Sequence, residues 1–246
     1  MSLTPNEKST FIREGMLIRR NAVAPELISR ARELVDDWYH EAMDPALIDG
    51  YTQRTFAPEF KSHPDLLALF AQSPAAELAA ELLGTFRPVA TMQLQIRVPE
   101  GRLSTPQPEK SMHVDGVACP HLDPNELRTF SLLAGVVLSD ITDPQGGALH
   151  YQPGGHQAMS EWFQSEWSQG LTKQVPPELD AQSGTPFLGR PGDLLLMHHL
   201  VPHAVGRNFG AEPRIMVYFR VEHTDHAQRR LDALHDPWLD YQGLRT

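Results

Sequence analysis

The first third of the chain repeats its apolar residues with the period of an α-helix. In the stretch 24–42 the apolar residues stand three or four positions apart; they are Leu27, Ile28, Ala31, Leu34, Val35 and Trp38. Such spacing gives a helix one apolar face, and Pro25 is well suited to the first helical turn. A second helical pattern begins near Pro74 and meets Gly84 where a C-terminal cap belongs. Both helices are predicted to pack against other elements as scaffold, the first of them on a sheet.

From residue 91 the period changes to two, which is the period of a β-strand. Met92, Leu94, Ile96 and Val98 alternate with polar residues up to Arg97, which predicts a strand with one apolar and one polar face. Further strands are predicted in 130–140, 140–156, 193–206 and 214–223. Because turns rich in Gly and Pro divide these short strands, the pattern indicates a mainly β fold with flanking α-helices. Its core would be a double-sheet jelly roll or a barrel rather than repeated βαβ units.

The pattern predicts a single domain over 1–246. No internal repeat, low-complexity tract or linker interrupts the sequence, and one domain of this length is common. We expect N-terminal helices over about 1–90, a jelly-roll core over about 91–225, and a short C-terminal tail.

Composition and charge narrow the class of partner. The net charge is −10, and lysines and arginines are scattered, whereas a nucleic-acid surface needs a basic stripe. No apolar run has the length of a membrane span, and the N-terminus lacks the apolar stretch of a signal peptide. The single Cys119 cannot form an internal disulfide. We therefore expect a cytoplasmic protein that binds small molecules, not nucleic acid or membrane, with its oligomeric state open.

Three His-x-Asp triplets are candidate metal-binding motifs. They are His113 with Asp115, His121 with Asp123, and His223 with Asp225. A non-haem iron site that activates oxygen uses two histidines and one carboxylate on one side of the metal. Residues two apart on an extended segment point the same way, so His-x-Asp suits half of such a site. The second histidine must then come from another strand.

The segment 193–206 offers that second histidine. Its candidates are His198, His199 and His203, and Arg214 opens the strand that follows. Strand alternation puts His199 on the side of His203, so it is either a hydrogen-bonding neighbour of the ligand or, in a shifted register, the ligand itself. The planar fork of an arginine beside a metal ligand suits the carboxylate of a dicarboxylate co-substrate.

With these motifs the sequence resembles the phytanoyl-CoA dioxygenase family of Fe(II)- and 2-oxoglutarate-dependent oxygenases. The segments that carry the resemblance are HVDG at 113–116, GVVLSD at 135–140, QGGALHYQPGGH at 145–156, and the run from 192 to 220. They occur in the order typical of that family, and the resemblance extends over nearly the whole chain. Two departures are that Val205 stands where the family often has Ser or Thr, and that PGGH replaces the commoner PGSH.

The resemblance implies the roles of individual residues. It makes His113, Asp115 and His203 the catalytic residues that bind Fe(II), and it makes Arg214 the anchor of the far carboxylate of 2-oxoglutarate. Gln95, on the polar face of the first strand, is then the candidate for binding the other end of this co-substrate. Thr129 and Ser131 are weaker candidates for the same role.

Other residues allow both a structural and a functional interpretation. The triplets at His121 and His223 are interpreted as surface loops rather than ligands. Arg220 points to the same side as Arg214 and either binds a substrate acid or forms a surface salt bridge, which is the preferred interpretation. The aromatic residues Trp162, Phe163 and Trp167 either form an apolar lid or pack a surface helix. The substrate pocket is expected to be shaped in part by the segments 117–129 and 51–60.

The resemblance implies a double-stranded β-helix core, that is a cupin-like jelly roll. It also implies an oxidoreductase that uses Fe(II), 2-oxoglutarate and O2, and that releases succinate and CO2. We expect it to hydroxylate a small metabolite, with cyclisation, desaturation and epimerisation as alternatives, in a secondary-metabolite pathway. Asp115 argues against halogenation, because halogenating relatives have a small residue there. Two other hypotheses remain open: a jelly-roll metalloenzyme that does not use 2-oxoglutarate, and a non-catalytic jelly roll that only binds a ligand.

Overall fold

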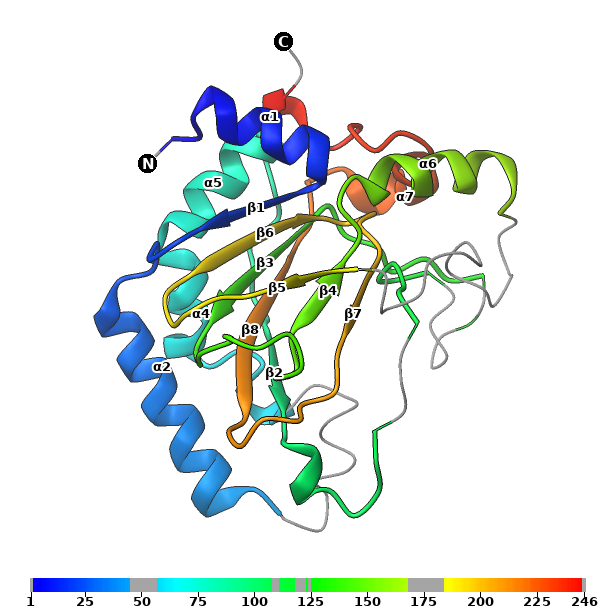
Figure 1. Ribbon diagram of the computed structural model, residues 1–246. Coiled ribbons are helices and arrows are strands. Elements are labelled where there is room, and N and C mark those ends of the chain that lie inside the picture. The colour runs from blue at the N-terminus through cyan, green and yellow to red at the C-terminus, as the bar shows by residue number, and fades with distance from the viewer. Residues whose placement is uncertain are drawn as a thin grey trace.

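Two antiparallel sheets form the centre of the computed structural model, which describes residues 2–44, 57–107, 111–117, 123, 125–167 and 184–244 (Figure 1). The five-stranded sheet has the order β1-β6-β3-β8-β2, and its strands are β1 (Met16–Arg19), β2 (Gln93–Arg97), β3 (Leu132–Val137), β6 (Leu194–His198) and β8 (Arg214–Val221). The three-stranded sheet has the order β5-β4-β7, and its strands are β4 (Leu149–Tyr151), β5 (Thr185–Phe187) and β7 (His203–Val205). The strands predicted from residue 91 onward are therefore present, but the segment 193–206, predicted as one strand, forms two, β6 and β7, and β5 was not predicted.

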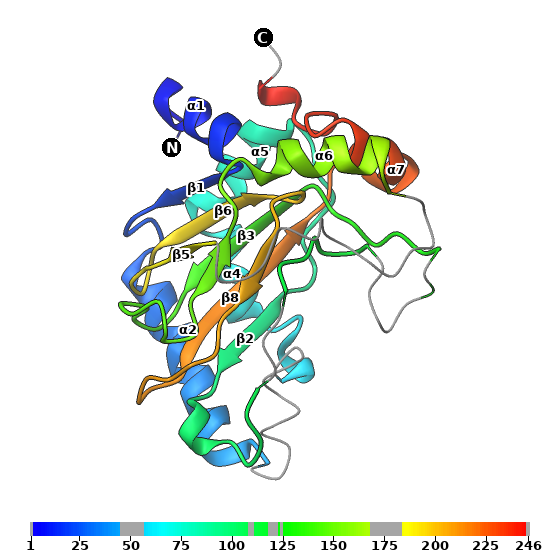
Figure 2. The ribbon, with the colours of Figure 1, turned by 45° about the vertical axis from the view of Figure 1, so that its right-hand side comes forward.

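Helices flank these sheets (Figures 1 and 2). The α-helices are α1 (Pro5–Glu14), α2 (Pro25–Asp37), α4 (Pro64–Ala71), α5 (Pro74–Leu83), α6 (Gly155–Ser165) and α7 (Arg230–His235). A π-helical turn, η1 (Trp38–Ala42), continues α2, and the short 3-10 turns are η3 (Pro58–Phe60), η4 (Glu100–Arg102), η6 (His226–Gln228) and η7 (Gln242–Leu244). Both predicted helices are confirmed, as α2 and α5. The fold thus mixes helices with a β core.

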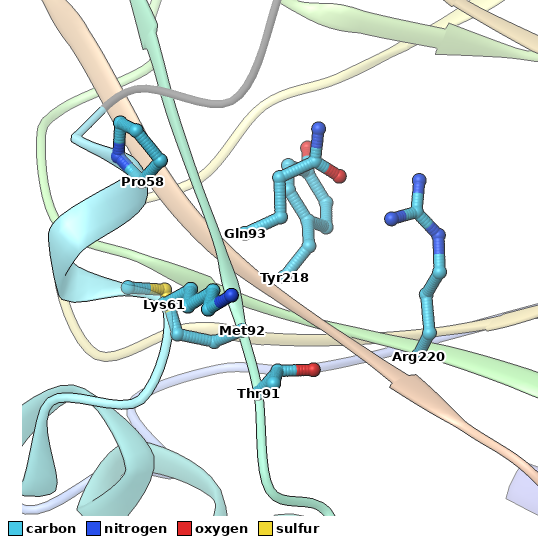
Figure 3. Close-up of a pocket in the computed structure, with 7 residues that line it drawn as sticks. All are labelled: Pro58, Lys61, Thr91, Met92, Gln93, Tyr218 and Arg220. Atoms are coloured by element: carbon cyan, nitrogen blue, oxygen red, sulfur yellow. The ribbon is translucent and has the colours of Figure 1, made fainter. Parts of the chain in front are cut away.

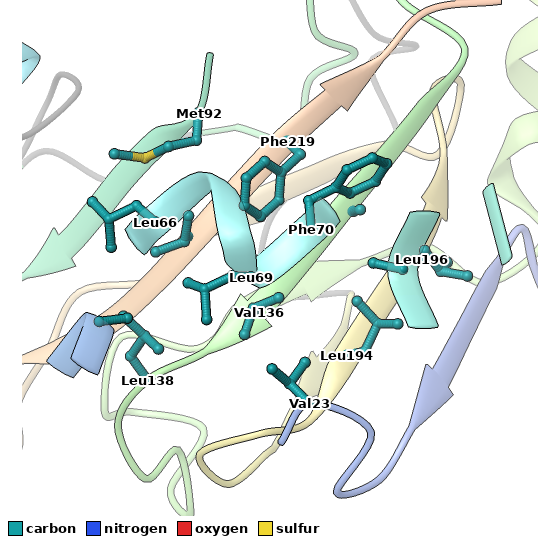
Figure 4. Packing of buried hydrophobic residues seen from close by; sticks show 14 of the residues in the cluster. Val23, Leu66, Leu69, Phe70, Met92, Val136, Leu138, Leu194, Leu196 and Phe219 are labelled. Carbon is teal, nitrogen blue, oxygen red and sulfur yellow. The ribbon is translucent and has the colours of Figure 1, made fainter. Parts of the chain in front are cut away.

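The larger hydrophobic core lies between α2, α4, α5 and the outer face of the five-stranded sheet. Figure 4 shows Leu66, Leu69 and Phe70 of α4 against Val136 and Phe219 of the sheet. Within the described residues no single helix is long and apolar enough to cross a membrane; α4 and α5 pass that test only as a pair, bent by 53°.

Strand β1 was not predicted. It lies in the region expected to be helical and pairs with β6 from Met16 opposite Met197 to Arg19 opposite Leu194. The four residues of β1 are too short to show an alternation, and their partner is distant in the sequence. The N-terminal region therefore supplies one strand of the larger sheet as well as helices.

The side chains of β2 alternate between the hydrophobic core and the opposite, polar face of the sheet. Leu94 and Ile96 are buried in the larger core, whereas Gln95 and Arg97 point to the opposite face of the sheet. On the same face, the ring of Tyr218 covers Gly135 of β3, where a Cβ atom would lie 2.9 Å from Tyr218 Cε1. Polar side chains of β2 and β8 thus share one face of this sheet.

Candidate metal and co-substrate site

His113, Asp115 and His203 lie together at the free edge of the three-stranded sheet, beside β7. One possible ligand atom of each lies within 4.8 Å of the others. Two backbone hydrogen bonds of 3.0 Å join His113 and His203 as an antiparallel bridge. Oδ1 of Asp115, two residues further along, lies 3.4 Å from Nε2 of His113. The structure brings these three predicted residues together.

Gly116 makes the turn that follows Asp115. Its φ is +81°, in the left-handed region, and its carbonyl accepts a 2.8 Å hydrogen bond from the backbone N–H of Arg128. A Cβ atom at this position would lie 2.3 Å from the carbonyl oxygen of Arg128. Only glycine fits both the backbone conformation and the close approach.

We expect Gly116→Ala to destabilise the protein by about 1–3 kcal/mol and to weaken metal binding, because the turn must open to admit the methyl group. Urea unfolding and an Fe(II) titration would measure both effects. Gly101→Ala is the matched control, since a Cβ atom there meets nothing within 4 Å. Equal losses in the two variants would contradict a special role for the turn.

Helix α6 supports the segment that carries the metal motif. Val114 and Val117 are buried against Met159 and Phe163 of this helix, in a small cluster of their own. Trp162 and Trp167 are partly buried against the same cluster, and Trp167 packs edge to face with Phe163, with ring centroids 5.3 Å apart. These contacts support the helix-packing interpretation of the aromatic residues.

The protonation states suit a divalent metal ion. Burial lowers the pKa of His203 to about 4, so its ring is neutral at pH 7. Nδ1 of His203 lies 2.9 Å from the carbonyl oxygen of Val201, which can only accept, so Nδ1 carries the proton and Nε2 keeps its lone pair. Burial would raise the pKa of Asp115, but the charge of Arg220 and the hydrogen bond with His113 outweigh it and hold this pKa well below its usual range. Two nitrogens and one ionised carboxylate are therefore a fitting donor set for Fe(II).

Arg214 is buried in the sheet with only 1% of its surface exposed. Its Nη2 donates to the Tyr218 hydroxyl at 2.7 Å and to Met216 Sδ at 3.0 Å, and its Nη1 lies 3.4 Å from Gln95 Oε1. Among the described residues no carboxylate pairs with it, and its Nε has no hydrogen-bond partner. A buried guanidinium with only neutral partners is costly, so this arrangement fits an anionic ligand.

Arg97 is a residue that the sequence interpretation missed. It lies opposite Arg214 in the pairing of β2 with β8, is nearly buried, and donates to Gln107 Oε1 at 3.1 Å. Burial and the neighbouring charge of Arg214 lower the pKa of Arg97 to about 10. Its place at the end of the polar alternation of β2 was the available signal. Arg97 thus places a second buried cation beside Arg214.

The other co-substrate candidates lie in different places. Gln95 lies beside Arg214, the candidate anchor of the far carboxylate of 2-oxoglutarate. Gln95 was predicted to bind the opposite end of this co-substrate. The Thr129 hydroxyl contacts His226 Nε2 at 2.9 Å, and the Ser131 hydroxyl donates to Asp240 Oδ2 at 2.6 Å. Thr129 and Ser131 therefore serve a buried network with the C-terminal segment.

His199 belongs to the same network and not to the metal cluster. Its two ring nitrogens lie 3.2 and 3.3 Å from the carbonyl oxygens of Ser131 and Ala233. Its ring stacks on His198, with centroids 4.6 Å apart. The prediction that His199 is a ligand or the neighbour of one is wrong, because the chain turns between β6 and β7 and the strand alternation does not continue across that turn.

The buried histidines predict a loss of stability in mild acid. Burial lowers the pKa of His156 and of His203 to about 4 and that of His199 to about 3, and it also lowers the pKa of His198. The unfolded chain takes up these protons below pH 6.5, but the folded protein does not. The free energy of unfolding is therefore highest above pH 6.5 and decreases as the pH falls toward 4. The decrease is about 1.4 kcal/mol per pH unit for each proton that only the unfolded chain binds.

We therefore expect the free energy of urea unfolding of the metal-free protein to be at least about 2 kcal/mol lower at pH 5 than at pH 7. Carboxylates with lowered pKa, such as Glu7 at about 2, contribute only below pH 4.5 and so do not enter this window. A constant unfolding free energy from pH 7 to 5 would show that these rings are not held neutral.

Two of the residues that were interpreted as surface groups, Arg220 and His223, have different surroundings in the structure. Nη2 of Arg220 pairs with Asp115 Oδ2 at 3.0 Å, so its salt bridge is made at the site rather than on a remote surface. His223 is buried, contrary to its interpretation as a surface residue, and its Nδ1 accepts from Arg229. Asp123 is exposed and accepts from the backbone of Asn125, as a loop residue does. His121 and Cys119 lie outside the described residues.

Comparisons with known proteins agree on fold and family. The phytanoyl-CoA dioxygenase (PhyH) family model matches residues 11–216. No curated protein matches the sequence significantly. Among solved structures, the α-ketoglutarate-dependent carbocyclase SnoK from nogalamycin biosynthesis is 15% identical, with a TM-score of 0.62 over 93% of this chain and 90% of SnoK.

Two further structures are similar at the same level. EctD from S. alaskensis, solved with 2-oxoglutarate and 5-hydroxyectoine, is 17% identical with a TM-score of 0.60, over 91% of this chain and 77% of EctD. HygX from Streptomyces hygroscopicus, solved with nickel, 2-oxoglutarate and hygromycin B, is 16% identical with a TM-score of 0.59, over 90% of this chain and 88% of HygX. At these identities the likeness shows the fold, and it confirms the predicted jelly roll.

Proposed function

Because the chain belongs to the phytanoyl-CoA dioxygenase family of Fe(II)- and 2-oxoglutarate-dependent oxygenases, we propose that it oxidises a small metabolite at an Fe(II) ion held by His113, Asp115 and His203. The observation that carries this proposal is the meeting of the three possible ligands at one point, with the ring of His203 neutral and Asp115 ionised. The assignment of Arg214 to the far carboxylate of 2-oxoglutarate is part of the same proposal, supported by its burial without a described carboxylate partner.

The residues of the chain would position the reactants. When bound together, Fe(II), 2-oxoglutarate and O2 supply the oxidising chemistry, with succinate and CO2 released. His113 and His203 are held by the main-chain bridge, so their spacing is set before a metal arrives. Arg214 and Arg97 would neutralise the far carboxylate, and Tyr218 fixes the guanidinium of Arg214. The buried surroundings limit the access of water to this end of the co-substrate.

The reaction that we propose is hydroxylation, with cyclisation, desaturation or epimerisation as alternatives on the same site. The carboxylate at Asp115 supports oxidation over halogenation. Proteins of the same fold include a carbocyclase of nogalamycin biosynthesis and a protein solved with hygromycin B, which supports a substrate from secondary metabolism.

An anaerobic titration tests this function. Fe(II) and then 2-oxoglutarate would be added to the metal-free protein while visible absorbance is followed, and succinate would be measured after air is admitted. We expect a weak absorption band that needs both components, and slow succinate formation. If the protein binds the metal but gives neither band nor succinate, the alternative of a metalloenzyme that does not use 2-oxoglutarate takes its place. If it binds neither, a non-catalytic jelly roll is the remaining hypothesis.

A further inference from the structure

A pocket lies beside the candidate metal cluster, on the face shared by β2 and β8. Its volume is about 270 Å³, and its lining residues are Pro58, Lys61, Thr91, Met92, Gln93, Tyr218 and Arg220. Figure 3 shows the amide of Gln93 and the ring of Tyr218 together at the centre, with Lys61 on one side and Arg220 on the other. This volume is slightly below the roughly 300–1,000 Å³ of typical ligand sites, so the pocket suits a small molecule.

Two lining residues of the pocket contact the two parts of the proposed active site. Arg220, on its wall, pairs through Nη2 with Oδ2 of Asp115 at 3.0 Å. Tyr218, also on its wall, accepts at 2.7 Å from Nη2 of Arg214. A molecule in this pocket therefore lies next to the candidate ligand Asp115 and to the candidate co-substrate anchor.

The charges of the described lining are all positive. Lys61 and Arg220 contribute two cations, and none of the described lining residues is acidic, although the chain as a whole has a net charge of −10. Lys61 makes no ion pair with any described residue. Arg220 uses one of its five N–H donors on Asp115, and its guanidinium lies 5.5 Å from the ring centroid of Phe130. Both cations are thus able to take a further anionic partner.

The polar neutral residues of the wall fit the same ligand. Gln93 begins β2 and Thr91 stands two residues before it, and both lie between the two cations (Figure 3). A hydroxyl and a carboxamide can each donate a hydrogen bond to a carboxylate oxygen. Cations flanking such donors are the arrangement that binds a carboxylate more strongly than a neutral group.

We propose that this pocket binds a carboxylate of the primary substrate through Lys61 and Arg220, so that the enzyme acts on a small organic acid. This inference rests on the proposed oxygenase function, because it places the acid next to the metal cluster. Arg220 then has two roles, since it also holds Asp115 Oδ2 and leaves Oδ1 facing His113.

Benzoate and benzamide are suitable probes, because they have similar size and shape but differ in charge. Each would be titrated calorimetrically into the anaerobic protein loaded with Fe(II) and saturating 2-oxoglutarate. We expect benzoate to bind at least about tenfold more tightly than benzamide, as a charge-assisted contact exceeds a neutral one by about 1.4 kcal/mol. Lys61→Gln should remove most of this preference. Lys8→Gln is the matched control and should keep the preference, since Lys8, on α1, pairs with Glu81 of α5 and is not among the described lining residues of the pocket.

Three results would overturn the proposal: equal binding of the two probes, no binding of benzoate, or a preference that survives in Lys61→Gln. A benzoate affinity that falls as 2-oxoglutarate is raised would place benzoate at Arg214 and would overturn it too. The binding of 2-oxoglutarate to the Fe(II)-loaded protein is measured separately in the same samples. Its absence would remove the proposed function, whereas its presence with any of the four results above removes only the assignment of an acidic substrate.

Discussion

Replacing His113 by alanine should lower the affinity for Fe(II) at least about 100-fold and abolish succinate formation. Loss of a residue that merely supports a metal ligand already costs about 10–100-fold, and His113 would itself be one of three protein ligands. His113 is a better choice than His203, because its side chain is partly exposed and its loss leaves a smaller cavity in the core. The backbone bridge to His203 does not depend on the side chain and should persist.

A competition titration with a coloured chelator would measure the Fe(II) affinity, with urea unfolding of the same proteins as a check on folding. His40→Ala is the control, since His40 is an exposed histidine outside the metal cluster. An unchanged affinity in His113→Ala would remove the metal assignment altogether. An equal loss in both variants would show that the effect is not specific to the cluster.

Replacing Arg214 by methionine should weaken 2-oxoglutarate binding by at least about 30-fold while Fe(II) binding is retained. Truncating one partner of a buried charge pair costs about 2–5 kcal/mol, and each 1.4 kcal/mol is tenfold in affinity. Methionine preserves much of the apolar volume of the side chain. The substitution removes a buried cation that has no described carboxylate partner, so folding should not suffer.

The 2-oxoglutarate affinity would be read from the visible band of the anaerobic Fe(II) complex. Arg97→Met should weaken it in the same direction, because Arg97 lies opposite Arg214 in the sheet. Arg102→Met is the control, since the Arg102 side chain is exposed and, among the described residues, donates to the carbonyl of Ala211. If Arg214→Met binds 2-oxoglutarate as the natural protein does, the anchor lies elsewhere.

Features that repeat within one element could be predicted from the sequence. The period of two along β2 correctly separates Leu94 in the core from Gln95 on the polar face. The spacing of His113 and Asp115 likewise follows from the geometry of an extended segment, and the structure places both beside His203.

Features that depend on pairing between distant segments could not be predicted. The pairing of β1 with β6 has no local signal, and neither does the register that sets Arg97 opposite Arg214. The direction of the His199 side chain depends on the turn between β6 and β7, because this turn places the ring in a network with the C-terminal segment. Arg220 and Asp115 are far apart in the sequence, and no local sequence pattern predicts that they contact each other.

The pairing of β1 also has a consequence for the solubility of the protein. Without β1, the five-stranded sheet would end at β6, whose residues Leu194–His198 are all buried in the native fold. An apolar strand with unpaired backbone groups is a template for pairing with other chains. β1 is short and ends in Arg19, which pairs with Glu7. A short edge strand that carries charges is a poor partner for strands of other chains. The N-terminal segment therefore protects the protein against aggregation, a role separate from any part in catalysis.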